Sequence, residues 1–335
     1  MKALKALLRP IRRNLLCMGA AAVLALGALP QRSMAQSSWP ERPVRLIVPY
    51  AAGQGADVLA RLLTQELQKT LGQSFVIDNR AGAGGNIGAA AVAKAAPDGY
   101  TFLLGTNATN AANEFLFATP GFSAATDLEG VGMIGLLPMV FSTSSPDFPA
   151  NGIAELIAAA RAKPNTLNVG LPSTTAQVVF AQFVKEAQAP LFAVNYKSSG
   201  QSMTDALGGQ IPLVIDTVTA SRTHIASGKL RALGITSLHA SDMLPGVKPI
   251  SEQGVPGFDV VAWDAVFAPR GTPPEVVRKL SEHMQRALQQ PEMRRRMMEI
   301  GVEPRSMSAP ELDAFVKAER KKWGATIQAA GIRSE

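Results

Sequence analysis

Cysteine is nearly absent from this chain of 335 residues, because the only one is Cys17. It lies in an N-terminal segment that begins with basic residues, continues with the apolar run 15–29 and ends in the small residues Ser33 and Ala35. This pattern is typical of a secretory signal peptide, and the run is too short and wrongly flanked to span a membrane. We therefore predict a signal peptide over residues 1–35, periplasmic localisation, and a remaining chain without disulfides or cysteine ligands. A paired arginine at 12–13 leaves twin-arginine export open beside the general secretory route.

A strong excess of basic charge is also missing once this segment is set aside. The whole chain has 33 basic and 26 acidic residues, and the first 35 positions hold six of the basic residues and none of the acidic ones. Removing these six leaves 27 basic against 26 acidic residues, a net charge of +1. The isoelectric point near 9.7 is therefore a property of the precursor, and the sequence predicts no nucleic-acid partner.

Residues that would build a catalytic centre are scarce. The three histidines, His224, His239 and His283, have no metal-ligand spacing, and no G-x-S-x-G motif is present. A carboxylate pair formed by Asp57 and Asp216 would require two residues that are far apart in the sequence to meet. We expect no enzyme, no metal and no cofactor. A hydrolase that uses a Ser or Thr of segment 172–175 with an Asp stays open as a weaker alternative, because it lacks a base.

Alternating strand and helix patterns fill most of the chain. Leucine repeats every fourth residue in helix 56–72, with Asp57 as its expected cap and Gly72 as its expected end. Strand–helix alternation predicts an α/β fold with mostly parallel sheets covered on both faces. After a long strand at 258–269 the pattern is helical only, with capping boxes predicted at 272–275 and 308–311. The other expected strands are 44–50, 74–78, 100–105, 132–141, 167–170, 191–196, 211–216 and 230–236, and the other expected helices are 87–96, 152–162, 176–187, 202–209, 275–290 and 309–329.

The stretch "AGAGGNIGAA" (81–90) has glycines spaced as in some dinucleotide-binding turns. Such a site needs an acidic residue at the end of the next strand to bind the ribose. That strand ends here in Thr106 and Asn107, which are both neutral. The sequence therefore disfavours a dehydrogenase.

Five small, neutral loops follow predicted strands instead. Each opens onto a helix N-terminus, whose unpaired N–H groups and partial positive charge suit an anion without any lysine or arginine. Ligands of α/β proteins bind at this edge of the sheet. The loops are 50–57, 81–86, 105–109, 172–175 and 216–221.

Four long segments resemble the substrate-binding proteins of the tripartite tricarboxylate transporter family, also called Bug proteins. They are "VRLIVPYAAGQGADVLAR", "VIDNRAGAGGNIGAAAVAKAAPDGYTFLLGT", "GGQIPLVIDTVTASRTHIASGKLRALGITS" and "VPGFDVVAWDAVFAPRGTP". The resemblance implies a type II periplasmic-binding-protein fold, in which two lobes joined by crossover strands close over a small organic carboxylate. It places lobe 1 at 36–142 plus 264–335, lobe 2 at 143–263, and the ligand cleft between them. It also implies a monomer that delivers its ligand to a membrane permease, with a sensor module read by a receptor as the alternative.

The resemblance also implies which residues contact the ligand. In lobe 1 they are Tyr50, Ala51, Gly53, Gln54, Gly55, Ala56, Asp57, Gly85, Asn86, Thr106 and Asn107, and in lobe 2 they are Ser173, Thr174, Thr175, Asp216 and Thr217. Asp57 is expected to act structurally.

The chain departs from the family pattern at several of these positions. Gln54 replaces a glycine, Ala56 replaces a threonine, and Gln177 stands near the place of a histidine. With the apolar Leu171 and Pro172 in the second loop, these changes favour an elongated or aromatic carboxylate over a compact, highly charged one. Closure is expected about segments 141–145 and 260–264, beside Trp263.

Overall fold

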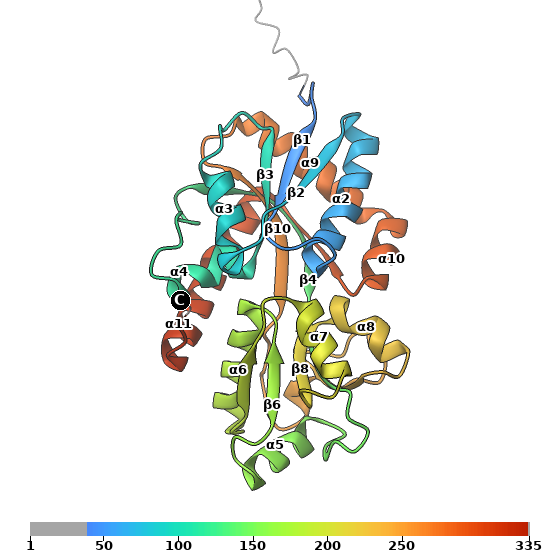
Figure 1. The fold of residues 1–335 in the computed structure, drawn as a ribbon. Coiled ribbons are helices and arrows are strands. Elements are labelled where there is room, and N and C mark those ends of the chain that lie inside the picture. The colour runs from blue at the N-terminus through green and yellow to red at the C-terminus, as the bar shows by residue number, and fades with distance from the viewer. Residues whose placement is uncertain (1–38, 334–335) are drawn as a thin grey trace, which may run out of the picture. The chain divides into compact units, whose positions relative to one another are not determined.

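Two β-sheets organise the computed structural model, which describes residues 39–333 (Figure 1). The predicted signal peptide lies outside these residues. The first sheet has six strands in the order β11-β4-β10-β3-β1-β2, and the second has five in the order β7-β6-β8-β5-β9. The first comprises β1 (Val44–Val48), β2 (Phe75–Asn79), β3 (Thr101–Thr106), β4 (Leu128–Leu137), β10 (Ala262–Pro269) and β11 (Glu303–Met307). The second comprises β5 (Met139–Thr143), β6 (Asn168–Leu171), β7 (Phe192–Asn195), β8 (Leu213–Thr217) and β9 (Arg231–Ile235).

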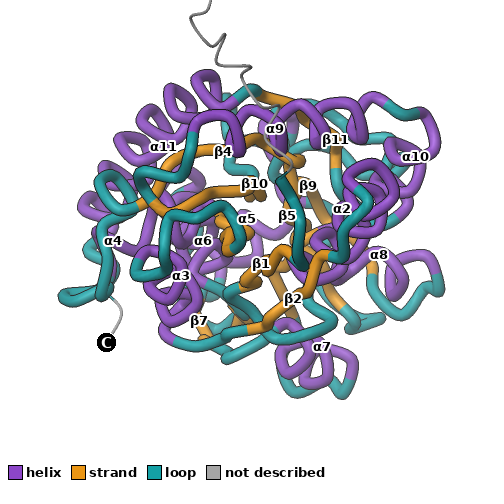
Figure 2. Tube along the Cα trace, turned by 90° about the horizontal axis from the view of Figure 1, so that it is seen from above, coloured by secondary structure: helices purple, strands orange, loops and turns teal. Residues whose placement is uncertain are grey.

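Helices cover both faces of each sheet. Helices α2 (Gly55–Leu71), α9 (Pro274–Gln289) and α10 (Pro291–Glu299) pack on one face of the first sheet, and α3 (Asn86–Ala93) and α11 (Ala309–Ala330) on the other (Figure 2). The π-helical turn η2 (Ala108–Ala112) and the short α4 (Asn113–Leu116) lie beside α11. The second sheet carries α5 (Ile153–Ala162) and α6 (Thr174–Ala187) on one face, and α7 (Ser199–Leu207) and α8 (Val218–Ala226) on the other. We call the first sheet with its helices lobe 1, and the second sheet with α5–α8 lobe 2.

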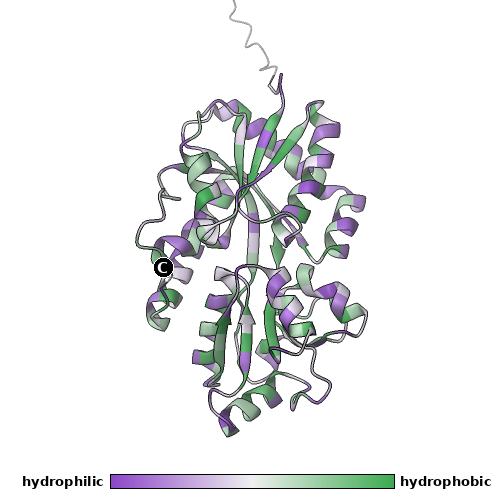
Figure 3. Cartoon of the chain, in the orientation of Figure 1, coloured by the Kyte–Doolittle hydropathy of each residue, from purple (hydrophilic) through white to green (hydrophobic). Residues whose placement is uncertain are grey.

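The hydrophobic pattern explains these layers. In β1 the side chains of Val44, Leu46 and Val48 join the core under α2, while Ile47 joins the core on the opposite face, as the two-residue period of a strand requires. Leu59, Leu63 and Leu67 of α2 are at most 2% exposed. Apolar residues concentrate in the strands, and the outer faces of the helices are hydrophilic (Figure 3).

Both sheets are mixed, so the expectation of mostly parallel pairing is corrected. Strand β1 pairs in parallel with β2 and β3, but β10 runs antiparallel between β3 and β4. Strand β5 runs antiparallel to both β8 and β9, while β6 pairs in parallel with β7 and β8. Strands β5 and β10 arrive from the other lobe, and that crossing sets their antiparallel direction, while β11 of lobe 1 also pairs antiparallel with β4. The α/β class is confirmed.

The chain crosses between the sheets twice. It leaves β4 at Leu137 and enters β5 at Met139, and it returns between Ile235 of β9 and Ala262 of β10. These points precede the predicted lobe limits, 142 and 263, by a few residues. The domain limits themselves stay a prediction.

The C-terminal third is not helical only. Strand β11 pairs antiparallel with β4 at the sheet edge, and its sequence "EPRSM" lacks the alternation that would reveal a strand. The predicted strand 258–269 begins only at Ala262. Within residues 39–333, no helix is both long and apolar enough to cross a membrane.

The observed helix ends match the predicted ones at some positions and differ from them at others. The capping box at Ser308 and Glu311 is confirmed, and Gly72 ends α2 in the left-handed conformation. The box predicted at 272–275 is wrong, because Thr272 donates its hydroxyl to the carbonyl of Pro269 at 2.8 Å and the helix begins at Pro274. Asp57 lies inside the first turn of α2, after the N-cap residue Gln54.

Candidate ligand-binding site

A cavity of about 710 Å³ lies between the two sheets and receives residues from both lobes. Thirteen of the sixteen predicted contact residues line it: Tyr50, Ala51, Gln54, Gly55, Ala56, Gly85, Thr106, Asn107, Ser173, Thr174, Thr175, Asp216 and Thr217. Segment 81–84 and Pro172, Gln177, Tyr196, Lys197, Ser199 and Asp264 also line it, together with apolar walls from Pro49, Phe117, Leu137 and Ala262. The remaining three predicted residues, Gly53, Asn86 and Asp57, do not line it.

Five helix N-termini reach this cavity. From lobe 1 come the first turn of α2, with Gly55 and Ala56, and the N-cap of α3, Gly85. From lobe 2 come the first residues of α6 and α7 and the N-cap of α8. Each terminus contributes a partial positive charge, and all but that of α3, whose first N–H group is bonded to the carbonyl of Ala83, also present first-turn N–H groups without an intrahelical partner. Among residues 39–333, Lys197 is the only basic residue on the wall, so the site can hold an anion largely by backbone dipoles.

The glycine-rich stretch owes its residues to close packing. Gly85 has φ +98°, and a Cβ there would lie 2.8 Å from Cγ2 of Thr109. A Cβ on Gly88 would lie 2.9 Å from Cα of Pro49 and from the carbonyl of Arg80, so glycine lets α3 touch the first loop. The stretch therefore shapes a turn and brings its backbone to the cavity, without the acidic residue of a dinucleotide site.

The helices whose N-termini reach the cavity are capped differently in the two lobes. In lobe 2 the side chain of Ser173 accepts from the N–H of Ala176 at 3.2 Å, and Thr217 accepts from Ala220 at the same distance. Ser198 caps α7 in the same way, at 3.3 Å from the nitrogen of Gln201. In lobe 1 neither Gln54 nor Gly85 supplies a side-chain cap to its helix.

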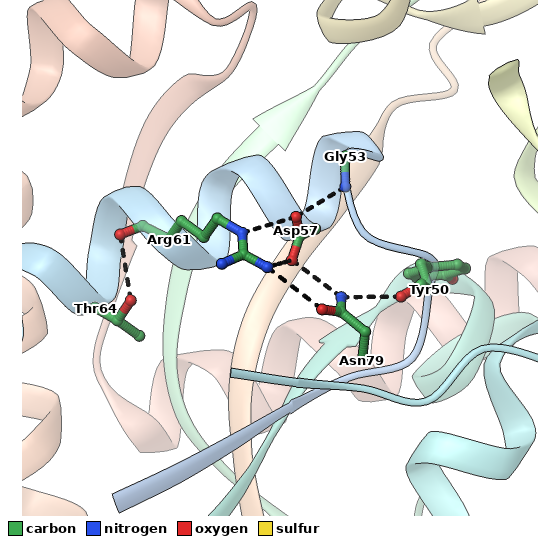
Figure 4. Close-up of polar contacts among 6 residues, drawn as sticks. All are labelled: Tyr50, Gly53, Asp57, Arg61, Thr64 and Asn79. Carbon is green, nitrogen blue, oxygen red and sulfur yellow. Dashed lines mark hydrogen bonds and ion pairs between the residues drawn. The ribbon is translucent and has the colours of Figure 1, made fainter. Parts of the chain in front are cut away.

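Asp57 stabilises loop 50–57 from the side that faces away from the cavity (Figure 4). Its carboxylate is 2% exposed and accepts from the N–H of Gly53 at 2.9 Å, from Arg61 at 2.9 and 3.0 Å, and from Nδ2 of Asn79 at 3.0 Å. Asn79 also donates to the carbonyl of Tyr50 at 3.1 Å. Burial acts to raise the pKa of Asp57, but the hydrogen bonds outweigh it and hold the pKa below its usual value. Asp57 therefore positions the loop and does not face the cavity.

Asn86 likewise serves the loop from outside the cavity. Its Oδ1 accepts from Nδ2 of Asn113 at 2.7 Å, and the same Nδ2 donates to the carbonyl of Gly84 at 3.0 Å. This pair of amides ties the glycine stretch to α4. Gly53 lies on the outer side of the α2 loop, in a second hollow that also contains Arg222.

Tyr50 and Thr106 place a hydroxyl donor at the wall. Oγ1 of Thr106 lies 3.2 Å from the nitrogen of Ala108 and 3.4 Å from that of Thr109, so it accepts from both. With both lone pairs used, its own proton points to the hydroxyl of Tyr50, 2.9 Å away. The proton of Tyr50 is then available to a ligand. Burial raises the pKa of Tyr50, so this hydroxyl stays protonated.

Two buried aspartates stand at the cavity. Asp216 accepts from Oγ of Ser199 at 3.1 Å and from the N–H of Thr217 at 2.7 Å, all through Oδ1. Burial raises the pKa of Asp216 to about 6, and these bonds partly offset the rise. Burial raises the pKa of Asp264 to about 7. In the described part of the chain, Oδ2 of each aspartate has no hydrogen-bond partner.

The lobes touch directly beside the cavity. Nδ2 of Asn107 donates to Oγ1 of Thr175 at 2.9 Å across the two lobes. Farther out, the guanidinium of Arg222 in α8 donates to the carbonyls of Met298 and Glu299 at the C-terminal end of α10. This is the end of a helix at which a cation is favoured.

Several lining residues were missed by sequence reasoning. Asp264 was treated only as part of a strand, and Tyr196, Lys197 and Ser199 follow β7 without a glycine-rich signal. The position of Ser198 directly before a helix, where its side chain caps α7, is a signal that would have revealed this loop. Asp264 has no such local signal, because its place depends on the crossing of β10 between lobes.

The weaker hydrolase alternative would use a Ser or Thr of segment 172–175 with an Asp. Of these hydroxyl groups, Oγ of Ser173 caps α6, and among residues 39–333 no histidine lines the cavity. Across the same residues, no three His, Cys, Asp or Glu side chains gather to hold a metal ion.

Comparison with known proteins identifies the family. The tripartite tricarboxylate transporter family receptor model matches residues 59–332. BugT of Bordetella pertussis is 35% identical over 299 residues, covering 88% of this chain and 91% of BugT.

Solved structures agree with this assignment. An R. palustris protein with adipate is 36% identical with a TM-score of 0.84, covering 88% of this chain and 99% of that one. MatC from Rhodopseudomonas palustris with bound malate is 30% identical with a TM-score of 0.78, covering 86% and 100%. A structure of the periplasmic binding protein BugD is 33% identical with a TM-score of 0.80, covering 89% and 100%. These similarities confirm the two-lobed periplasmic-binding-protein fold, and the chain belongs to the tripartite tricarboxylate transporter receptor family, which includes the Bug proteins.

Proposed function

We propose that this protein is a periplasmic receptor that captures a small organic carboxylate between its lobes and delivers it to a membrane permease. The observation that carries the proposal is the meeting of five helix N-termini at one cavity whose wall has a single basic residue. Backbone N–H groups and hydroxyls bind a carboxylate at such a place by charge-assisted hydrogen bonds. A cavity of about 710 Å³ is in the range of small-molecule sites. Relatives of this fold were solved with adipate and with malate.

The mixture of apolar residues and helix N-termini on the cavity wall suggests which class of acid would bind. Phe117, Leu137 and Pro172 make part of it apolar, while the helix N-termini lie on both lobes. An elongated or aromatic acid would place its carboxylate on the N–H groups and its body against the apolar wall. We propose this class over a compact, highly charged acid.

Capture would proceed by closure. The hydrogen bond between Asn107 and Thr175 and the bonds of Arg222 to the end of α10 are the contacts that would separate on opening. The hinge would lie where the chain crosses, near Pro138 and Val261. A sensor module whose closed form is read by a receptor is the alternative, because it would need the same cavity and the same motion.

A thermal-shift screen of the exported protein tests the proposal. The panel would hold dicarboxylates, tricarboxylates, aromatic acids and, as controls, the matching amides. A ligand at a hundred times its Kd adds about 2.7 kcal/mol to the free energy of unfolding, so a carboxylate should raise Tm where its amide does not. A shift with amides alone, or with no acid, would contradict carboxylate capture. Hydrolysis of a chromogenic ester that is lost in Ser173→Ala would instead favour the hydrolase.

A further inference from the structure

Asp264 stands on the cavity wall without a partner. It lies on β10, where its Cα pairs with Thr106 on one side and Gly135 on the other. The residue is 3% exposed and lines the cavity. Among residues 39–333, no donor reaches its Oδ2. A buried carboxyl group in this state has been taken from water without receiving hydrogen bonds in return.

The charged and titratable groups around Asp264 do not neutralise it. Strand β3 and helix α3 pack beside β10 and contain no ionisable residue. Glu129 of β4 pairs with Ala268, four residues along the strand, and Glu319 of α11 binds the indole of the neighbouring Trp263 at 2.9 Å.

The cavity itself adds four more titratable groups. They are the Tyr50 hydroxyl and, on the opposite lobe, Asp216, Lys197 and Tyr196, whose hydroxyl donates to Asp205. Burial is the cause of the raised pKa of Asp264, about 7, and no charged group offsets it.

Asp57 shows what a partnered carboxylate looks like in the same lobe. It receives donors from Gly53, Arg61 and Asn79, and its pKa is lowered. Asp216 is intermediate, since one oxygen receives two donors and the other none. Asp264 is thus the carboxyl group of the cavity that is most easily protonated.

The protonation state of Asp264 matters because a bound acid brings a second negative charge into the cavity. An acid held at the helix N-termini shares a poorly hydrated space with Asp264, and two carboxylates so placed repel each other strongly. Protonating Asp264 removes the repulsion and supplies an O–H donor to the ligand oxygen.

We propose that Asp264 binds the ligand as a neutral carboxylic acid, so that capture of an anionic acid takes up one proton from solution. This inference rests on the proposed capture of a carboxylate. It makes Asp264 a specificity-determining residue, which favours anionic groups when protonated and groups that carry their own donor, such as hydroxyl or ammonium, when ionised. The proton travels with the ligand in the closed complex and is released with it.

The test is the pH dependence of Kd for adipate and malate, by calorimetry on the exported protein between pH 6.5 and 8.5. Both carboxyl groups of these acids titrate below that window. Because the complex holds more protons than the free protein, affinity should fall about tenfold for each pH unit above about 7 and level off below it. Repeating the titration at pH 8 in phosphate and in Tris, whose ionisation enthalpies differ, should show uptake of nearly one proton per ligand.

Two matched variants locate the proton. Asp264→Asn keeps the shape and is neutral at every pH, so its Kd should be flat over this window and tighter than that of the wild type at pH 8. Asp216→Asn removes the other buried carboxyl group and should keep the wild-type slope. Proton uptake that survives in Asp264→Asn, or a wild-type affinity that is flat or rises with pH, overturns the inference while leaving carboxylate capture intact.

A measurement on the free protein distinguishes failure of the Asp264 inference from failure of the proposed carboxylate capture. The side-chain carboxyl carbon of Asp264, identified by its loss in Asp264→Asn, should titrate near pH 7 in the carbon NMR spectrum of the free protein. A midpoint below about pH 5, close to the ordinary value for aspartate, would overturn the inference whatever binds. Failure of both acids to bind at any pH, with a titration near 7, would count against carboxylate capture and thereby against the coupling.

Discussion

The helix N-termini of the two lobes meet at one cavity but are finished in different ways. In lobe 2, Ser173 and Thr217 each occupy one first-turn N–H group of their own helix. In lobe 1, α2 follows Gln54 without a side-chain cap, so its first N–H groups are left for a ligand or for water. Helix α3 also has no side-chain cap, but it continues from the 3₁₀ turn Ala83–Gly85, where the carbonyls of Gly82 and Ala83 accept from the N–H groups of Gly85 and Asn86. We therefore expect the stronger anion site at α2 of lobe 1, while lobe 2 offers hydroxyl groups and helix ends that each have one first-turn N–H group already bonded.

This difference suggests that the two lobes have separate roles in binding. A carboxylate would bind first on lobe 1, whose loop is held rigid by Asp57 before any ligand arrives. Lobe 2 would then close over it, adding hydroxyl contacts from Thr174 and Thr175.

The largest effect is expected from a negative charge placed on the lobe 1 loop. Ala51→Asp puts a carboxylate beside the uncapped end of α2, where it would take the ligand's place on the N–H groups and repel it. Affinity for the best acid should fall by about a hundredfold or more. Gln177→Glu, on the first turn of α6 in lobe 2, is the matched change and should cost about tenfold. Equal losses in calorimetry, with Tm unchanged in both, would contradict these separate roles.

Removing the Asp57 carboxylate, which anchors loop 50–57, should weaken binding less than Ala51→Asp does and should clearly lower the stability of the protein. Asp57→Ala leaves the N–H of Gly53 and the side chain of Asn79 without their acceptor, which should cost about 2 kcal/mol of folding free energy and about tenfold in affinity. Because the folded-state pKa of Asp57 is lowered, its contribution is present above the unfolded value and is lost as pH falls through the folded pKa. Urea unfolding at pH 7 and at pH 3 should show the difference from wild type shrinking in acid.

Asp98 offers a control for the anchor. It pairs with Arg42 at 2.9 Å, but both side chains are exposed. Asp98→Ala should therefore change stability by less than about 1 kcal/mol and leave Kd unchanged. An Asp57→Ala protein as stable as this control would show that the loop needs no anchor.

The smallest effects on binding are expected from the lobe 2 caps. Ser173→Ala and Thr217→Val each remove one cap and should lower the free energy of unfolding by about 1 kcal/mol, with less than about fivefold change in Kd. Ser198→Ala removes the equivalent cap of α7 from a position that does not line the cavity, so it should change stability alone. Cap variants that weaken binding more than Ala51→Asp would reverse the roles of the lobes.

Local patterns predicted most helices and strands because those elements follow from residue spacing. Leucines at every fourth position gave α2, and a short β-branched run gave β1, each within one or two residues at either end. Strand β11 was missed because its residues are polar and half-exposed, so only pairing with β4 makes it a strand. The misplaced start of α9 reflects two successive prolines, of which the second begins the helix.

The lining of the candidate cavity was predictable where a loop connects a strand to a helix, and only there. Such loops carry glycine, serine or threonine for backbone reasons, and these residues are visible in the sequence at 81–86 and 172–175. Asp264 lies inside a strand, and its isolation arises from neighbours on β3, β4 and the facing lobe. Desolvation of this kind depends on the whole assembly, so no local pattern records it.

The position of β10 in the first sheet has a consequence for the order of folding. It lies between β3 and β4 but comes from residues 262–269, whereas every strand of the second sheet is complete by residue 235. Because distant pairing must overcome a large loop-closure entropy, the second sheet should form early and the first should wait for the last third of the chain. Until then β3 has an unpaired edge, which is a site for wrong association. The cavity between the sheets, which needs strands of both, should then form late.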